Sequence, residues 1–254
     1  MLRTALEQTT HRFVLRRRMP PPFDTARLYV SSEGGLRYLR PRLDGVDPAL
    51  LQLASELIQP GSVVWDIGAN LGLFTFAAAV AAGPSGYVLS VEPDTALVQL
   101  LRRSAALNRG HAPVDVLPTA VADSSGVGRF HIARRNRSTS HLDGFGTTQT
   151  GGIRTTEIVP TVTLDWLTER FPMPHLIKVD VEAAESEVLA GGPTVLRSLP
   201  TIICEVAGRN SARVAEVLSS YGYNLYDASQ PESKRSPLSV APPDTLAQAS
   251  GAPA

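Results

Sequence analysis

A buried strand, a turn rich in small residues and an Ala-rich helix follow one another between residues 63 and 80. The stretch begins with the apolar residues typical of a parallel strand, and at Asp66 it gives way to the turn. From Leu73 to Val80 the composition favours a helix. This order opens a nucleotide-binding α/β unit, in which glycines let the backbone approach a ligand where the free N–H groups of the helix point.

The turn has the pattern Asp66-x-Gly68-x-Asn70-x-Gly72 and lacks the G-x-G-x-x-G fingerprint of dinucleotide-binding proteins. Asn tolerates a left-handed backbone, so Asn70 can replace a middle glycine. A carboxylate at Asp66 would repel a pyrophosphate and attract a cation. S-adenosylmethionine (SAM) carries an ammonium and a sulfonium but no phosphate, so the turn favours SAM over NAD. The alternative is an ordinary βα turn with an Asp helix cap.

Composition narrows the class of protein. The 254 residues suffice for one large or two small domains, and 43% hydrophobic content supports a sizeable core. Lys and Arg together number 24, as do Asp and Glu, so bulk charge does not indicate binding to nucleic acid or an anionic membrane. The single Cys204 excludes an internal disulfide. Because we find no secretory signal and no apolar stretch long enough for a membrane span, we expect a cytoplasmic protein.

Pro, Gly and Ser clusters divide the chain into three parts. We expect residues 1–48 to form a leader, a hairpin of strands 28–30 and 36–39, and a cap. Residues 49–228 alternate strand and helix patterns and are predicted to form an α/β domain with a mostly parallel sheet and helices on both faces. Residues 229–254 are predicted to add an edge strand and a disordered tail.

Acidic residues stand at or near the ends of the predicted strands. They are Asp66, Glu92, Asp123, Asp180 and Glu205. Because ligands of doubly wound sheets bind outside the carboxyl ends of the strands, we expect these carboxylates to face one cleft. A negative cleft in a chain of zero net charge suits a cation such as SAM, or a divalent metal, better than a phosphate-rich cofactor.

Two of these acids are predicted to contact a nucleoside. Glu92 follows Gly72 by about twenty residues, the spacing at which an acid takes the ribose hydroxyls. Asp123 is placed to accept a hydrogen bond from an adenine amino group, with Val121 beside the ring. A surface acid before a Pro turn is the alternative for Glu92, and an ordinary turn is the alternative for Asp123.

Five blocks in chain order resemble the FkbM-type SAM-dependent methyltransferases. They are residues 66–72, 91–94, 120–123, 164–165 and the Lys-x-Asp-x-Glu-x-x-Glu block at 178–185. The likeness spans roughly residues 50 to 207, and the last block is its most specific part. One position departs from the pattern, because Ala183 stands where the family usually has glycine.

The resemblance implies a class I methyltransferase fold with a seven-stranded, Rossmann-like sheet and SAM as the methyl donor. It also implies O-methylation of a hydroxyl on a natural product, a sugar or a glycolipid. Carried over by position, Asp66, Gly68, Asn70 and Gly72 would hold the methionine end of SAM, Glu92 the ribose and Asp123 the adenine.

Transfer to a hydroxyl also requires removal of a proton. The predicted bases are Asp180 and Glu182 at a strand exit, and His141 in a long polar segment from 134 to 152. Pairing of Asp180 with Lys178 is the structural alternative. Asp180, Glu182 and Glu205 are also oxygen ligands of the type that divalent cations prefer, but no His or Cys cluster indicates a transition metal.

The predicted partner is a small-molecule hydroxyl acceptor, without nucleic acid; the sequence does not indicate an oligomeric state. Three rival functions stay open. A dehydrogenase would need the missing middle glycine. A nucleic-acid methyltransferase would need more than the small basic cluster near Arg137. A non-catalytic interaction protein with the SAM fold would follow if Ala183 marks loss of activity.

Overall fold

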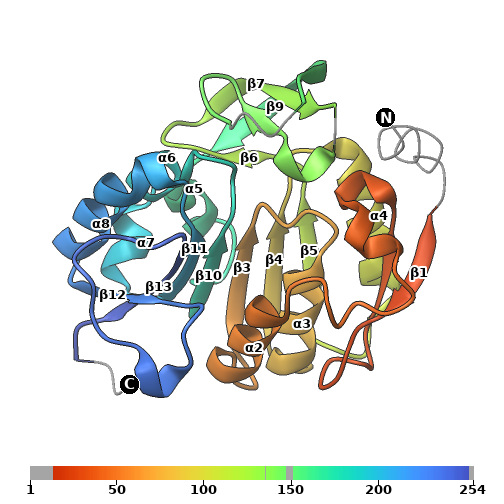
Figure 1. The fold of residues 1–254 in the computed structure, drawn as a ribbon, viewed down its shortest axis with the longest axis horizontal. Helices are drawn as coiled ribbons and strands as arrows, with labels where there is room; N and C mark the ends of the chain where they lie inside the picture. Colours follow the sequence, from red (N-terminus) through yellow and green to blue (C-terminus); the bar gives the residue numbers. More distant parts are fainter. Residues whose placement is uncertain (1–13, 135, 147–150, 252–254) are drawn as a thin grey trace.

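The computed structural model describes residues 14–134, 136–146 and 151–251. Its centre is a seven-stranded sheet in the order β12-β13-β11-β10-β3-β4-β5 (Figure 1). The strands are β12 (Tyr223–Asp227), β13 (Asp244–Ala249), β11 (Thr201–Glu205), β10 (Leu176–Val179), β3 (Val63–Ile67), β4 (Tyr87–Val91) and β5 (Val114–Leu117). Only β13 runs antiparallel to its neighbours within this sheet, which confirms the expected mostly parallel class I fold.

Helices cover both faces of the sheet (Figure 1). One layer holds α2 (Pro48–Leu57), α3 (Leu73–Ala82) and α4 (Thr95–Leu107), and the other α5 (Leu164–Thr168), α6 (Glu185–Ala190), α7 (Pro193–Arg197) and α8 (Ser211–Ser220). Neighbouring strand residues alternate between the two layers: Val64 packs toward α3, and Trp65 packs toward α5 to α8. Both side chains are fully buried, as expected of a parallel sheet covered on both sides.

A second, four-stranded sheet lies over the carboxyl edge of the first and is green at the top of Figure 1. It contains β6 (Ala120–Val121), β7 (Gly126–Ala133), β8 (His141–Leu142) and β9 (Ile153–Val162). Residues 114–123, an apolar stretch interrupted by Pro118, do not form one continuous strand. Instead the chain leaves β5 at Pro118, which has no N–H to donate, and β6 pairs with β9.

The predicted N-terminal hairpin is wrong. The partner of β2 (Arg27–Val30) is β1 (Leu15–Arg18), and residues Leu36–Leu39 form a 3-10 turn, η2, after another, η1 (Ser32–Gly34). A short apolar run does not distinguish a strand from such a turn. Part of the expected leader is packed against the rest of the chain, since Met19 is 2% exposed. Residues 1–13 lie outside the described part of the chain.

The predicted C-terminal edge strand and disordered tail are also wrong within the described residues. Residues 236–240 make a single bridge, from Leu238 to Leu225. The strand that forms is β13, and it lies between β12 and β11 in the interior of the sheet. Its Thr245, Leu246 and Ala247 are fully buried.

Among the described residues, no helix combines the length and the apolarity that crossing a membrane requires.

Candidate active site

The turn after β3 is left-handed at three positions. Gly68 has φ +78°, Asn70 +53° and Gly72 +86°, so Asn70 does occupy a position of the kind that glycine favours. A Cβ on Gly68 would lie 1.8 Å from the carbonyl oxygen of Asp180. This contact packs the turn against the exit of β10 and leaves no room for a side chain.

Asp66 lies behind the turn and is fully buried. Its Oδ2 accepts a hydrogen bond from Thr75 Oγ1 at 2.6 Å, and its Oδ1 lies 3.3 Å from Lys178 Nζ. Lys178 also donates to the carbonyl of Gly68 at 2.9 Å and pairs with Asp180 at 3.2 Å. Asp66 therefore helps to hold Lys178 in place, and Lys178 in turn contacts the carbonyl of Gly68 and the carboxylate of Asp180.

Lys178 is charged despite its burial. Burial by itself lowers the pKa of Lys178, but Asp180 and Asp66 outweigh it and hold that pKa above its ordinary value. The ammonium therefore ties two carboxylates and the glycine turn together.

Glu92, at the exit of β4, is only 5% exposed. Its Oε2 accepts from the backbone N–H of Asn70 at 2.8 Å, and its Oε1 accepts from that of Asp94 at 2.9 Å. Burial raises the pKa of Glu92 to about 8, although these hydrogen bonds oppose the rise. Each oxygen keeps a lone pair that can accept a ligand hydroxyl.

A first pocket, here called the cap-side pocket, lies between the strand ends and the second sheet. It is lined by Gly68, Glu92, Val121, Phe130, Leu142 and Asp180, among others. Apolar side chains of the second sheet thus face polar groups from the exits of β4 and β10.

A second pocket, here called the helix-side pocket, lies on the α2 side of the turn. It is lined by Tyr38, Asp47, Leu50, Asn70, Lys178, Asp180, Glu205 and Asp244, among others. Asp180 lines both pockets, so this residue stands between the two.

Like charges at this junction raise the pKa values of neighbouring acids. Asp180 is the main cause for Glu205, whose pKa rises to about 7. For Glu182 the main cause is burial, followed by Asp180, and its pKa rises to about 8. Within the described residues, no group of three or more His, Cys, Asp or Glu side chains has the arrangement that could hold a metal ion.

The turn after Asp180 is left-handed at Glu182, with φ +52°, and at Ala183, with φ +77°. The N–H of Ala183 donates to Glu185 Oε1 at 2.7 Å. Asn210 Nδ2 donates to the Ala183 carbonyl at 2.9 Å and to Glu185 Oε2 at 2.7 Å. Ala183 thus keeps a conformation that favours glycine, held by the last Glu of the 178–185 block.

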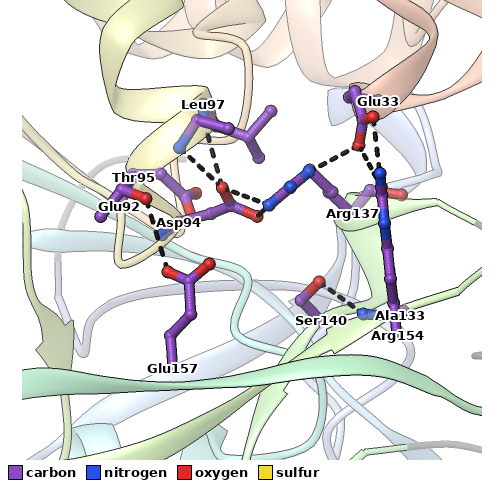
Figure 2. A network of polar contacts seen from close by, with 12 residues as sticks. Glu33, Glu92, Asp94, Thr95, Leu97, Ala133, Arg137, Ser140, Arg154 and Glu157 are labelled. Carbon is purple, nitrogen blue, oxygen red and sulfur yellow. Dashed lines mark hydrogen bonds and ion pairs between the residues drawn. The ribbon is translucent and has the colours of Figure 1, made fainter. Parts of the chain in front are cut away.

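An ion-pair cluster stands beside the cap-side pocket (Figure 2). Arg137, in the 3-10 turn η3 (Arg137–Thr139), reaches Glu33 at 2.5 Å on one side and Asp94 at 2.7 Å on the other. Arg154 of β9 lies 3.1 Å from Glu33. Asp94 also caps α4 by accepting from Ala96 and Leu97 N–H. The cluster joins the N-terminal turn, α4 and the second sheet.

Four predicted site residues line neither pocket: Asp66 and Gly72, which support the turn from behind, and Asp123 and His141, which lie elsewhere. Asp123 is exposed beyond β6 and accepts from Ser124 Oγ at 3.0 Å. His141 is buried in β8, where its ring packs edge-on against His131 at 5.6 Å between centroids. Its neighbours Ser140 and Leu142 line the cap-side pocket instead.

Sequence reasoning missed the outer walls of the helix-side pocket. Tyr38 was placed in a hairpin strand and Asp244 in a disordered tail, and neither was given a role. No local pattern marks them, because long-range packing brings both to the pocket. The pairing of Lys178 with Asp180, in contrast, is among the alternatives that the sequence suggests.

Comparison with known proteins gives one family match. Residues 66–225 match the model of the methyltransferase FkbM domain. A hexuronic acid methyltransferase, AglP, of Haloferax volcanii is 30% identical over 173 residues, which are 67% of this chain and 66% of that protein. The chain thus spans slightly under two thirds of the length of this relative.

Solved structures give weaker likenesses. A precorrin-6y C5,15-methyltransferase of Geobacter metallireducens has a TM-score of 0.44 at 14% identity, covering 79% of this chain and 86% of that one. A SAM-dependent O-methyltransferase of Thermotoga maritima has a TM-score of 0.46 at 10% identity, covering 82% and 66%.

Proposed function

Since this chain belongs to the FkbM methyltransferase family, we propose that it transfers the methyl group of SAM to a hydroxyl of a small molecule, with a sugar as the favoured acceptor. The observation that carries the proposal is that Asp180 lines both pockets. A donor in the cap-side pocket and an acceptor in the helix-side pocket would then meet at one carboxylate.

The residues of the cap-side pocket fit SAM better than a dinucleotide. The N–H groups of Gly68 and Ala69 both donate to the Val91 carbonyl, and that of Asn70 donates to Glu92. These donors are therefore not free to cradle a pyrophosphate. Glu92 offers acceptor oxygens to ribose hydroxyls, and the acids at the strand exits favour a cationic ligand.

SAM, when bound, supplies a methyl group on a sulfonium, and transfer of that methyl leaves a neutral thioether. The acceptor oxygen forms the new C–O bond and loses its proton to a carboxylate of Asp180. Lys178 pairs with Asp180 at 3.2 Å and fixes the orientation of that carboxylate. Holding both reactants in line contributes up to about 7–11 kcal/mol in well-oriented reactions.

The remaining predicted residues take other roles in this proposal. Gly68, Asn70 and Gly72 shape the turn, and Asp66 positions Lys178. Glu182 borders the cap-side pocket beside Asp180. His141 and Asp123 line neither pocket, so the base is assigned to Asp180 and no adenine contact to Asp123.

The sugar class has support from the name of the Haloferax volcanii relative, which acts on a hexuronic acid. The polar lining of the helix-side pocket is consistent with an acceptor that carries several hydroxyls. Arg137, the centre of the basic cluster that a nucleic-acid enzyme would use, is instead paired with Glu33 and Asp94.

Calorimetric titration with S-adenosylhomocysteine (SAH), beside NADH, tests the donor site. We expect micromolar SAH binding and no NADH binding. Glu92→Gln weakens SAH binding by about twofold to tenfold at neutral pH, the loss expected for one hydrogen bond to a carboxyl that burial keeps largely protonated. Glu216→Gln, on an exposed part of α8, is the matched control and binds as the wild type does. Binding of NADH, or no SAH binding by folded protein, would refute the proposal.

A further inference from the structure

About half of the residues that line the helix-side pocket lie outside residues 66–225, the part of the chain that matches the family model. Arg37, Tyr38 and Asp47 precede that part, and Ser229 and Asp244 follow it. The family match therefore covers only the inner part of this pocket, around Lys178, Asp180 and Glu205, and the chemistry of its outer walls must be derived from the side chains outside the match.

Negative charge is in excess in the pocket. Asp47, Asp180, Glu205 and Asp244 line it, against the cations Arg37 and Lys178. The Lys178 charge is already shared between Asp66 and Asp180, at 3.3 and 3.2 Å. Arg37 is held in place by donating through Nη1 to the Val46 carbonyl at 2.9 Å, next to Asp47.

Tyr38 is the second feature of the pocket. It is only 3% exposed and lines the cavity, yet its hydroxyl has no hydrogen-bond partner within the described part of the chain. The phenol interacts electrostatically with Lys178 and Asp180, which places it toward the junction of the two pockets. Burial raises the pKa of Tyr38 to about 12, so the group remains a donor at neutral pH.

We propose that the helix-side pocket binds an uncharged, polyhydroxylated acceptor of hexoside type and rejects acceptors that carry a carboxylate. Tyr38 donates to an oxygen of the acceptor, and Glu205 and Asp244 accept from its hydroxyls. The proposal rests on the proposed function and deepens it by naming the acceptor class.

Uncharged acceptors and acceptors that carry a carboxylate should differ in affinity because they interact differently with the carboxylates of the pocket. Hydroxyls donate to ionised carboxylates in strong, charge-assisted hydrogen bonds. A carboxylate on the acceptor would instead add a like charge in a partly buried site, where screening by solvent is weak. This chain would then differ in specificity from the relative named for hexuronic acid.

Saturation-transfer NMR on SAH-loaded protein tests the acceptor class. The probes are the methyl glycosides of glucose, galactose and mannose, each beside the corresponding methyl hexuronoside. We expect saturation of at least one hexoside and at least a fivefold smaller effect on its uronate. In Tyr38→Phe the hexoside signal falls by more than half, whereas Tyr221→Phe, outside the pocket, leaves it unchanged. In the double variant Glu205→Gln, Asp244→Asn the discrimination against the uronate falls at least threefold.

Calorimetry with SAH on the same samples separates the two proposals. SAH binding without saturation of any hexoside, or with a uronate saturated as strongly as its hexoside, overturns the acceptor class and leaves the proposed function standing. An unchanged hexoside signal in Tyr38→Phe overturns the role of Tyr38. Loss of SAH binding in folded wild-type protein overturns the proposed function and this inference together.

Discussion

The backbone of Gly68 lies against the carbonyl of Asp180 so closely that a methyl group on Gly68 would sit 1.8 Å from that oxygen. The contact joins the turn after β3 to the residue that lines both pockets. Positive φ at Gly68 adds a second reason why a side chain is disfavoured there. Because Gly68 has no Cβ, the carbonyl of Asp180 can approach the turn this closely, and this approach helps to fix the position of Asp180.

Gly68→Ala is therefore expected to abolish SAH binding and to lower the free energy of unfolding by about 2 kcal/mol or more, from overlap and backbone strain. Calorimetry and urea unfolding measure the two effects. Gly110→Ala is the matched control, since a Cβ there meets nothing within 4 Å and its φ is not positive. Wild-type SAH affinity in Gly68→Ala would show that the turn does not position the cap-side pocket.

Ala183→Gly is expected to stabilise the protein. A non-glycine residue at positive φ costs about 1–2 kcal/mol, and the greater freedom of glycine in the unfolded chain offsets about 0.5–1 kcal/mol of the gain. We therefore expect urea unfolding to show a net gain of about 0.5–1 kcal/mol.

The matched control for that variant is Ala184→Gly. Its φ of −109° is ordinary for alanine, so glycine there relieves no strain and lowers stability through the entropic loss and the loss of a buried methyl group, which Ala183→Gly shares. If Ala183→Gly is also destabilising, the strain at the turn is compensated by contacts other than the hydrogen bonds to Glu185 and Asn210.

Local signals account for what the sequence predicted well. The turn from Asp66 to Gly72 was recognised because Gly and Asn mark left-handed positions, and the sheet because its strands are short apolar runs. Glu92 was found by its spacing from Gly72. Such patterns specify the centre of the fold and the proposed donor side of the site.

Non-local packing accounts for what the sequence did not predict. Asp244 begins a strand whose residues, Asp-Thr-Leu-Ala-Gln-Ala, contain no apolar run, and it becomes an interior strand only because β11 and β12 pair with it. Tyr38 reaches its pocket through a 3-10 turn that resembles a strand in sequence. The proposed acceptor side of the site depends on these two segments.

Glu182→Gln is expected to stabilise the protein more at pH 9 than at pH 5. Burial raises the pKa of Glu182 to about 8 in the folded state, above its ordinary 4.5. The folded state thus holds the proton more tightly, and stability is lost as the pH rises from about 4.5 to 8. Gln cannot ionise and removes this loss. Urea unfolding at pH 5 and at pH 9 measures the difference, with Glu216→Gln at an exposed position as the control. An equal effect of Glu182→Gln at the two pH values would contradict the burial of this carboxyl.

The Arg137 cluster gives the last prediction, because its two arginines differ in burial. The Arg137 side chain is 13% exposed and pairs with Asp94, which is fully buried, whereas Arg154 is 39% exposed. Arg137→Met removes the partner of a buried carboxylate and is expected to cost about 3 kcal/mol of unfolding free energy. Arg154→Met leaves that pair intact and is expected to cost about 0–1 kcal/mol.

Because Arg137 holds the second sheet to α4 beside the cap-side pocket, Arg137→Met should also speed SAH dissociation in stopped-flow experiments. Equal unfolding costs for the two variants, or unchanged dissociation in Arg137→Met, would show that the cluster does not hold the second sheet in place.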